Sequence, residues 1–423
     1  MKKVAIFSAL LLLGLALSQL LPTLVGPELL GPLGAVFEAL TMWMLAFIMI
    51  HVGYEFHIDK RNLRQYGWDY VVAMTAAAFP WIFVALYFLA VMLPDGSLTS
   101  WEAWKETLLT ARFAAPTSAG VLFAMLAAAG LSATWVFRKT RILAIFDDLD
   151  TVLLMIPLKM LMVGVAWQLG GVVLVMVALL WIAWRYLHRI RIPVSWPWVL
   201  GYAAVITAAS ELVYYGSKLL DDSVPIHVEV LLPAFVLGCV MAVPAGSDPH
   251  RDDDREGHQE GPESVQEQRV STVVSALFMV LVGLSMPSLF NVGAGAGSGS
   301  SSHGEVGGWG WIAAHVVAVT VIANAGKMFP LVCYRKEASW RERLAVCIAM
   351  WPRGEVGAGV LLVSLAYGIG GPILTVAMLS LALNIALTGL FVLCVKRLIL
   401  VGEAAEADGA TAPAALGVSG AHP

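Results

Sequence analysis

Long apolar runs, separated by short polar breaks, follow one another along almost the whole chain. Twelve of these runs have about the 20 residues that a helix needs to cross the hydrocarbon core of a bilayer. They cover residues 4–21, 33–53, 68–93, 107–129, 142–165, 169–187, 197–217, 226–245, 270–290, 309–333, 343–367 and 371–397. Since 59% of the 423 residues are apolar and only 13% are charged, the pattern predicts an all-α polytopic membrane protein with about 12 transmembrane helices.

The positions of Lys and Arg predict how this protein is oriented. With the N-terminus in the cytoplasm, 20 of the 26 Lys and Arg residues fall in inside loops, as the positive-inside rule requires. We therefore expect a multi-pass protein of the cell (inner) membrane, in contact with lipid, with both termini cytoplasmic. A cleaved signal peptide is the alternative interpretation of the first run, because Lys2 and Lys3 precede a short apolar stretch.

Three segments between or after the runs differ in composition. Residues 246–269 are highly charged and predict a disordered cytoplasmic linker; a metal site at His250 and His258 is the alternative. Residues 293–308 are rich in Gly and Ser, which predicts a flexible outer loop. Residues 401–423 are small and polar, which predicts a disordered tail. No basic surface indicates a nucleic-acid partner.

Three aspartates stand close together in the fifth run, within the stretch IFDDLDTVLLMIPLK that covers residues 145–159. Each carboxylate at the centre of a membrane helix costs about 2.5–3.5 kcal/mol on insertion scales. Asp147 and Asp150 share a helix face, and Asp148 lies about 100° away from Asp147. Such oxygens can hold a small cation, and neighbouring carboxylates in a poorly solvated place favour a shared proton. The stretch therefore predicts a site where a cation and a proton compete.

Four basic residues also lie inside predicted helices, and one of them can meet these acids. The four are Arg112, Lys159, Lys327 and Arg353. Asp147 and Asp148 lie about six residues, or roughly 9 Å, from the cytoplasmic end of their run, and Lys327 lies at a similar depth. We expect a buried ion pair between Lys327 and an aspartate; a lysine that extends to the membrane surface is the alternative.

Two of the predicted helices are interrupted near their middle. The fourth run contains Ala114–Gly120, with Pro116, and the eleventh contains Trp351–Gly357, with Pro352. Under the predicted orientation these two helices run in opposite directions, so runs three to five match runs ten to twelve as an inverted repeat. Discontinuous helices at corresponding positions of two repeats point to a transport site near the midplane. Pro and Gly that are merely tolerated in membrane helices are the alternative.

Five short motifs in this order resemble one known family, the monovalent cation:proton antiporters, and within it the branch that contains bacterial sodium/proton antiporters. The motifs are Gly53-Tyr54-Glu55-Phe56, Thr117-Ser118-Ala119-Gly120, Phe146-Asp147-Asp148, Gly326-Lys327 and Pro352-Arg353-Gly354-Glu355-Val356-Gly357. The resemblance covers most of the chain. It implies inverted-topology repeats, two crossed discontinuous helices, and a transporter that is not an enzyme and needs neither a cofactor nor a nucleotide.

The resemblance also implies roles for particular residues. Asp148 is expected to bind sodium and protons in turn, Asp147 to contribute to the sodium site and to pair with Lys327, and Thr117 and Ser118 to be nearby polar ligands. The exchange domain is expected within residues 1–400. A moving core of about residues 68–165 and 309–397 is expected to slide in an elevator-like motion against a scaffold that forms a homodimer. Paired acids with a lysine imply electrogenic exchange.

The sequence leaves alternatives open for the preferred cation and for the activity. Potassium-efflux relatives usually carry a glutamine before the aspartate and a nucleotide-binding domain, and this chain has neither, which favours sodium or lithium. A potassium/proton antiporter on the same fold is the first alternative. A membrane sensor or scaffold that transports nothing is the second, with residues 246–269 as its output segment.

Several charged residues depart from the family pattern or lack an assigned role. Asp150 is expected either to add a ligand or to pair with Lys159 or Arg112, and these two bases are expected to extend toward the outer membrane surface. Further candidates are Arg353, with Glu211 or Glu229 as its partner, and Glu355 and Asn384. His51 and His315 are either pH sensors or packing residues, and packing is the more common role of a lone histidine in a membrane helix.

Overall fold

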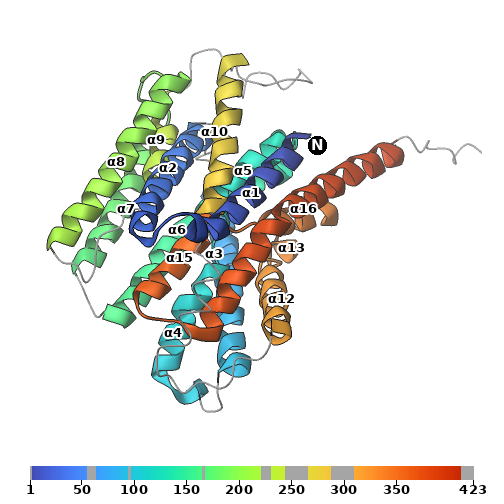
Figure 1. The fold of residues 1–423 in the computed structure, drawn as a ribbon. Helices are drawn as coiled ribbons and strands as arrows, with labels where there is room; N and C mark the ends of the chain where they lie inside the picture. Colours follow the sequence, from blue (N-terminus) through green and yellow to red (C-terminus); the bar gives the residue numbers. More distant parts are fainter. Residues whose placement is uncertain are drawn as a thin grey trace, which may run out of the picture.

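The computed structural model describes residues 2–54, 63–93, 97–163, 167–220, 230–242, 265–286 and 309–410. The regular structure in these ranges is helical, apart from one isolated β-bridge between Ile190 and Met241. The helices are α1 (Lys2–Leu24), α2 (Pro27–Tyr54), α3 (Leu63–Tyr87), the π-helix η1 (Phe88–Met92), the 3₁₀ turn η2 (Ser97–Thr99), α4 (Trp101–Ala111), the 3₁₀ turn η3 (Arg112–Ala114), α5 (Ala119–Ala128), α6 (Trp135–Val163), α7 (Trp167–Tyr186), α8 (Trp196–Leu220), α9 (Leu231–Val240), α10 (Val265–Leu284), α12 (Trp309–Gly326), α13 (Pro330–Cys333), α14 (Trp340–Ala349), α15 (Glu355–Ala366) and α16 (Gly371–Ala410). Within the described residues, each of the twelve predicted runs contains one of these helices or consecutive shorter ones (Figure 1).

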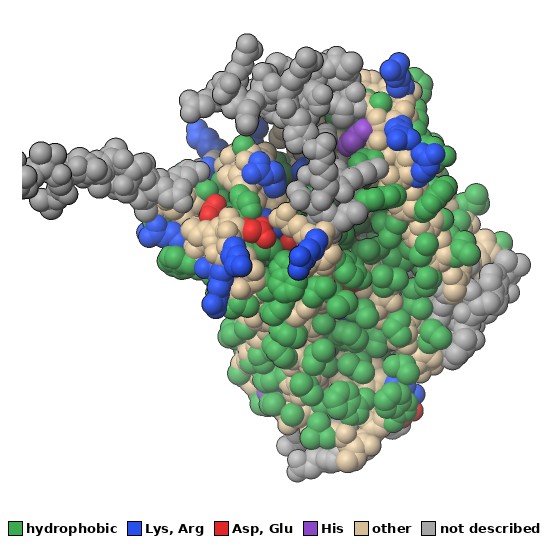
Figure 2. Space-filling model, turned by 180° about the vertical axis from the view of Figure 1, so that it is seen from behind, with side chains coloured by type: hydrophobic (Ala, Val, Ile, Leu, Met, Phe, Trp, Pro, Cys, Tyr) green, Lys and Arg blue, Asp and Glu red, His purple; other side chains and the backbone are tan. Residues whose placement is uncertain are grey.

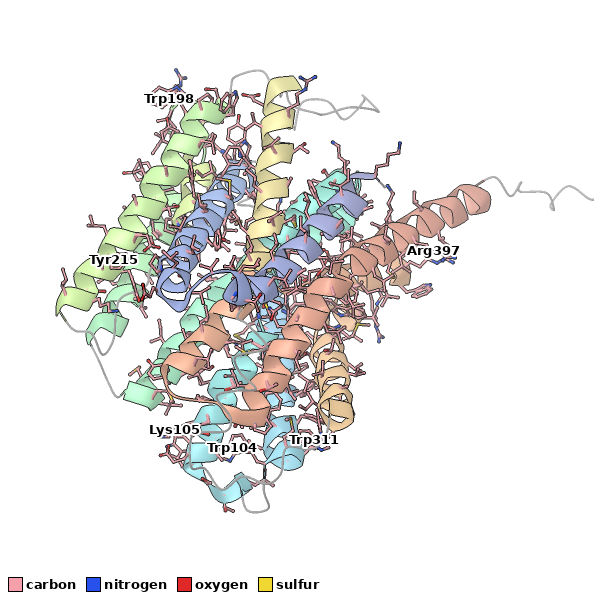
Figure 3. The ribbon with its side chains drawn as sticks, viewed as in Figure 1. Trp104, Lys105, Trp198, Tyr215, Trp311 and Arg397 are labelled. Carbon is pink, nitrogen blue, oxygen red and sulfur yellow. The ribbon has the colours of Figure 1, made fainter. Side chains whose placement is uncertain are left out.

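The surface of the bundle is that of a multi-pass membrane protein. Seven helical segments within the described ranges are long and apolar enough to cross a bilayer. Apolar side chains cover the middle of the face shown in Figure 2, and Lys and Arg gather mainly at one end of it. In Figure 3, Trp104 and Trp311 lie at one end of the bundle, and Trp198 and Arg397 lie toward the other. Aromatic and basic residues at the two borders of an apolar band are typical of membrane interfaces.

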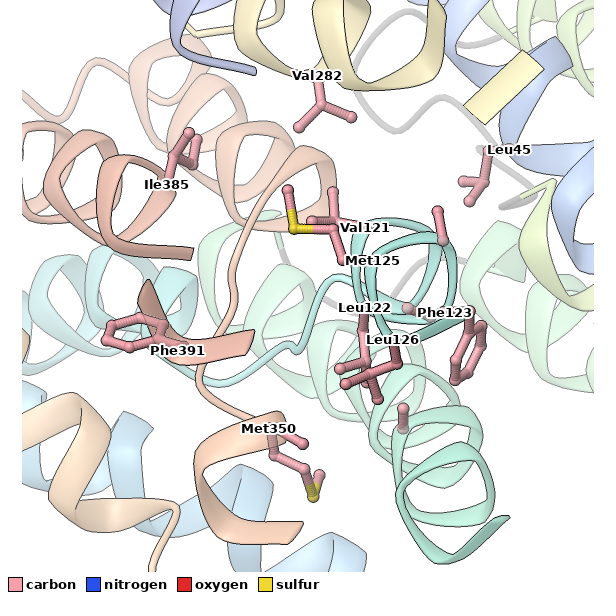
Figure 4. Close-up of a cluster of buried hydrophobic side chains, with 14 of the residues drawn as sticks. Leu45, Val121, Leu122, Phe123, Met125, Leu126, Val282, Met350, Ile385 and Phe391 are labelled. Atoms are coloured by element: carbon pink, nitrogen blue, oxygen red, sulfur yellow. The ribbon is translucent and has the colours of Figure 1, made fainter. Parts of the chain in front are cut away.

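The helices form two groups that meet where α1 packs on α16 and at the short helix α5. In one group α3 packs on α4, α6 and α12, and α16 packs on α12 and α14; in the other, α2 packs on α8, α9 and α10, and α10 packs on α1. Helix α5 contacts members of both groups, among them α1, α2, α6 and α10. Figure 4 shows Val121 and Met125 of α5 among Leu45 of α2, Val282 of α10 and Ile385 of α16. Apolar packing thus holds this half-helix between the two groups.

Helix α6 begins earlier than the sequence predicts. It starts at Trp135 rather than near residue 142, so Asp147 lies about 18 Å from its start rather than 9 Å. The extra turns contain Lys139, whose Nζ lies 3.1 Å from Asp69 Oδ1 and 2.9 Å from Glu337 Oε2. Because these acids compensate its charge, this basic segment packs as a buried helix instead of forming a loop.

Two segments expected to be disordered are partly helical. Helix α10 begins at Val265, so the last residues of the expected linker 246–269 belong to a helix. Helix α16 runs on to Ala410, because residues 403–407, EAAEA, are strong helix formers. The remainder of the linker, with His250 and His258, the Gly/Ser loop, and residues 411–423 lie outside the described residues.

Candidate functional site

The two interrupted helices cross where their helical hydrogen bonding stops. One break lies at residues 115–118, between η3 and α5, and the other at residues 350–354, between α14 and α15. Each contains a proline, which lacks an amide hydrogen and disfavours a helical conformation in the residue before it. Within the membrane the freed backbone groups need partners from the protein.

The two breaks supply these partners to each other. The Ser118 amide donates to the Pro352 carbonyl at 2.9 Å, and the Thr117 hydroxyl donates to the Met350 carbonyl at 3.1 Å. Close approach also requires Gly354, since a Cβ atom there would lie 2.9 Å from Ser118 Oγ. The predicted crossing of two discontinuous helices is therefore present, with Thr117 and Ser118 in it.

Helix α6 places Asp147 against this crossing. Asp147 Oδ2 accepts hydrogen bonds from Lys327 Nζ at 2.8 Å and from the Thr117 amide at 2.8 Å. Lys327 Nζ also donates to Thr117 Oγ1 at 3.1 Å. The side chains of Asp147 and Lys327 are both 0% exposed, so the charges compensate each other away from solvent. The expected contact between Lys327 and an aspartate is present, and the alternative of a lysine extended to the surface is wrong.

The run 309–333 predicts one continuous helix around Lys327. In the structure this helix is interrupted at Lys327. Helix α12 ends at Gly326, and Lys327 opens the turn that leads to α13. Pro330 accounts for the interruption, because it cannot donate the helical hydrogen bond to the Gly326 carbonyl. Gly326 lies against α3 so closely that a Cβ atom would be 2.6 Å from the backbone nitrogen of Pro80. A cation at a helix C-terminus is also favoured by the helix dipole.

Asp148 is the neighbour of Asp147 on α6 and is also buried, at 4% exposure. It lies within electrostatic range of Lys327. The structure thus gathers Asp147, Asp148, Thr117 and Lys327 from three parts of the fold into one buried place beside the crossing. Binding of a cation or a proton by these residues remains a prediction.

Arg353 and two asparagines form a second buried network at the crossing. The guanidinium of Arg353 donates to Asn324 Oδ1 at 2.7 Å, to the Ala114 carbonyl at 3.0 Å and to the Ala323 carbonyl at 3.1 Å. Asn384 Oδ1 accepts from the Arg353 amide at 3.0 Å, and Asn384 Nδ2 donates to Asn324 Oδ1 at 3.2 Å. Arg353 and Asn384 therefore tie α12 and α16 to both breaks.

The partner expected for Arg353 is different in the structure. Its hydrogen bonds go to Asn324 and to carbonyls, and none of its contacts within the described residues is with Glu211; Glu229 lies outside these residues. Asn324 was not predicted as a site residue. Its position three residues before Lys327 in the same apolar run is the one signal in the sequence that could have indicated it. The side chain of Glu355 lies outside the described part of the structure.

Asp150 and Arg112 lie together next to the acidic pair. Tyr70 of α3 donates to Asp150 Oδ1 at 2.8 Å, and Arg112 Nη2 donates to the backbone carbonyl of Asp150 at 3.1 Å. Arg112 is 0% exposed, so the expectation that it extends to the outer surface is wrong. The Lys159 side chain lies outside the described structure. Tyr70 was not predicted, because a tyrosine in a membrane helix carries no distinctive pattern.

The two intramembrane histidines have local partners. His51 Nδ1 lies 3.0 Å from the Phe47 carbonyl one turn earlier, and His315 Nδ1 lies 2.7 Å from Tyr87 Oη. These contacts are typical of packing residues. Within the described residues no group of three or more His, Cys, Asp or Glu side chains is arranged to hold a resident metal ion.

A helical membrane bundle with two crossed, interrupted helices and buried charges beside the crossing has the architecture of a secondary transporter. A family model described as "sodium/hydrogen exchanger, transmembrane" matches residues 2–392, and the chain belongs to this family. The predicted resemblance to monovalent cation:proton antiporters is thereby confirmed.

A solved structure shows the same fold. This chain is similar to the structure at pH 8 of the sodium proton antiporter MjNhaP1 from Methanocaldococcus jannaschii. The TM-score is 0.55, the sequence identity is 16%, and the alignment covers 91% of each chain. A comparison with curated protein sequences gives no match. Family and fold together support cation/proton antiport, the activity of a transporter and not of an enzyme.

Proposed function

We propose that the protein exchanges sodium or lithium for protons across the cell (inner) membrane, with Asp148 as the carboxylate that binds each ion in turn. The observation that carries this proposal is the buried contact of Asp147 with Lys327 and Thr117 at the crossing. Asp148, the next residue on α6, places a second buried carboxylate at the same site. Sodium is the transported substrate, and no bound cofactor takes part.

The burial of Asp148 gives a physical reason for coupled exchange. A bare carboxylate is costly in a poorly solvated place, whereas a bound proton and a bound sodium ion each supply one positive charge. The site therefore changes sides readily when loaded with either ion and slowly when empty. Thr117 and Ser118 would add oxygen ligands, which suit a hard monovalent cation.

Lys327 provides a reason for electrogenic exchange. When a sodium ion takes oxygen atoms of both Asp147 and Asp148, Lys327 loses the compensation of its charge and releases a proton. With the proton that sodium displaces from Asp148, two protons then leave for one sodium ion, so each cycle moves one net charge. We further propose that the helices around the crossing, within about residues 68–165 and 309–397, move as an elevator against the remaining helices, and that the latter form a homodimer.

A proteoliposome assay with several cations tests this proposal. Purified protein is reconstituted with a pH-sensitive dye inside, and proton flux is followed after gradients of sodium, lithium or potassium are imposed. We expect flux with sodium and lithium, little with potassium, and faster exchange when a membrane potential favours net charge movement. Flux with potassium alone would support the potassium alternative, and proton leakage that ignores every cation would refute antiport.

A further inference from the structure

Asp150 and Arg112 are a buried pair of opposite charges that the exchange cycle described above does not use. Asp150 is 2% exposed and Arg112 is 0% exposed. Tyr70 holds one carboxylate oxygen at 2.8 Å, and the Arg112 guanidinium carbon lies 4.8 Å from the centre of the Trp81 ring. The residues come from α6, α3 and η3, so the fold fixes both charges in place.

The two charged groups are not joined to each other by a hydrogen bond between their side chains. Within the described residues, Asp150 Oδ2 and the Nε and Nη1 atoms of Arg112 have no hydrogen-bond partner although they are buried. Arg112 donates to the backbone of Asp150 and not to its carboxylate. The two groups therefore act on their surroundings chiefly as charges, and in a poorly solvated interior such charges act over several ångströms.

These charges face the transport site. The Asp150 carboxylate lies within electrostatic range of Arg112, Asp147 and Lys327, and the Arg112 guanidinium lies within range of Asp147 and Asp150. Asp150 follows Asp147 by three residues on the same face of α6, whereas Asp148 points to a different face. A cation that takes oxygen atoms of Asp147 thus experiences a nearby negative charge from Asp150 and an opposing positive charge from Arg112.

We infer that Asp150 and Arg112 are an opposed pair of fixed charges that sets the cation affinity of the transport site. Asp150 increases the affinity for sodium and Arg112 decreases it. At a charge separation of about 10 Å and an effective dielectric constant of about 20, one charge changes the dissociation constant on the order of tenfold. This inference rests on the proposed function, and neither residue needs to touch the ion.

The test is the sodium KM of exchange in proteoliposomes, measured at one alkaline pH at which the carboxyl groups are ionised. Asp150→Asn keeps the acceptor for Tyr70 and removes the charge, so KM rises on the order of tenfold. Arg112→Gln removes the positive charge, so KM falls by a similar factor. In the double variant the two effects cancel, and KM returns close to that of the wild type.

Two matched variants separate this role from a loss of folding. Tyr70→Phe deletes the hydrogen bond to Asp150 but keeps both charges, so KM stays near the wild-type value. Arg112→Lys also keeps the charge, so KM again stays near that of the wild type. If Arg112→Gln does not fold, Arg112→Met removes the charge instead, and the same fall in KM is expected.

The outcomes distinguish this inference from the proposed function. KM values that move in opposite directions, and cancel in the double variant, support the opposed pair. Variants that only lower the maximal rate, or that shift KM in the same direction, show a structural role and overturn the inference alone. A wild type that exchanges no sodium or lithium overturns the proposed function and this inference with it.

Discussion

Replacement of Lys327 by methionine should destabilise the protein strongly. Methionine has a similar length and no charge, so it fills the same space. The change removes the partner at 2.8 Å from Asp147 Oδ2 and the donor to Thr117 Oγ1 at 3.1 Å. Asp147 keeps the hydrogen bond from the Thr117 amide, but its charge is left buried without its ion-pair partner.

The expected loss follows from the burial of both partners. Removal of one member of a fully buried ion pair costs about 3–5 kcal/mol, mostly because the remaining charge stays buried. The double variant Asp147→Asn with Lys327→Met removes both charges and should recover most of this loss, since an uncharged pair of similar volume carries no desolvation penalty.

The assay is thermal unfolding in detergent. Unfolding is followed by the fluorescence of a thiol-reactive dye, which rises as the buried Cys239 and Cys347 become accessible. Lys105→Met is the matched control, because Lys105 and Glu102 form a pair at the same kind of distance, 2.7 Å, with Glu102 72% exposed. That pair contributes about 1 kcal/mol or less. If Lys327→Met is as mild as Lys105→Met, or if adding Asp147→Asn restores no stability, the reasoning about a buried, mutually dependent pair is refuted.

Two further predictions concern the surroundings of the site. Gly326→Ala should lower the free energy of unfolding by about 1–3 kcal/mol, because its Cβ would meet Pro80. Gly310→Ala on the same helix, with open space around it, should be neutral or stabilising. Equal melting temperatures for the two variants would contradict the close contact. Lys139→Met should lower the free energy of unfolding by about 3–5 kcal/mol, because it leaves Asp69 buried without its cation. The Tyr334 hydroxyl also donates to Asp69, at 2.7 Å. A melting temperature like that of the wild type would show that this hydrogen bond alone compensates the charge of Asp69.

The elements that the sequence predicts correctly are those that the membrane constrains most. A bilayer imposes a length on each apolar run, so the described part of every run is mainly helical. It also makes internal charges costly, so the contact between Lys327 and the acids of α6 could be predicted from their presence and depth. Pro116 and Pro352 also indicated the two breaks, since a proline cannot donate a helical hydrogen bond. Within the membrane, an interrupted helix must find other hydrogen-bond partners.

The contacts that were missed depend on which helix faces which. Nothing in the sequence places Tyr70 beside Asp150 or Asn324 beside Arg353, because an uncharged polar residue can find a hydrogen-bond partner on any neighbouring helix. The start of α6 was misplaced for a related reason. A cluster that includes Lys139 is typical of a loop, and the compensating Asp69 and Glu337 lie far away in the chain.

The central claim, that Asp148 carries the exchanged ions, is tested most directly by sodium-driven proton flux in proteoliposomes that contain either the wild type or Asp148→Asn. Asparagine keeps the shape of the side chain and removes the charge, so the variant should fold with an unchanged melting temperature. We expect sodium-driven flux in the wild type and none in Asp148→Asn. Flux at the wild-type rate in the Asp148→Asn variant would contradict the account.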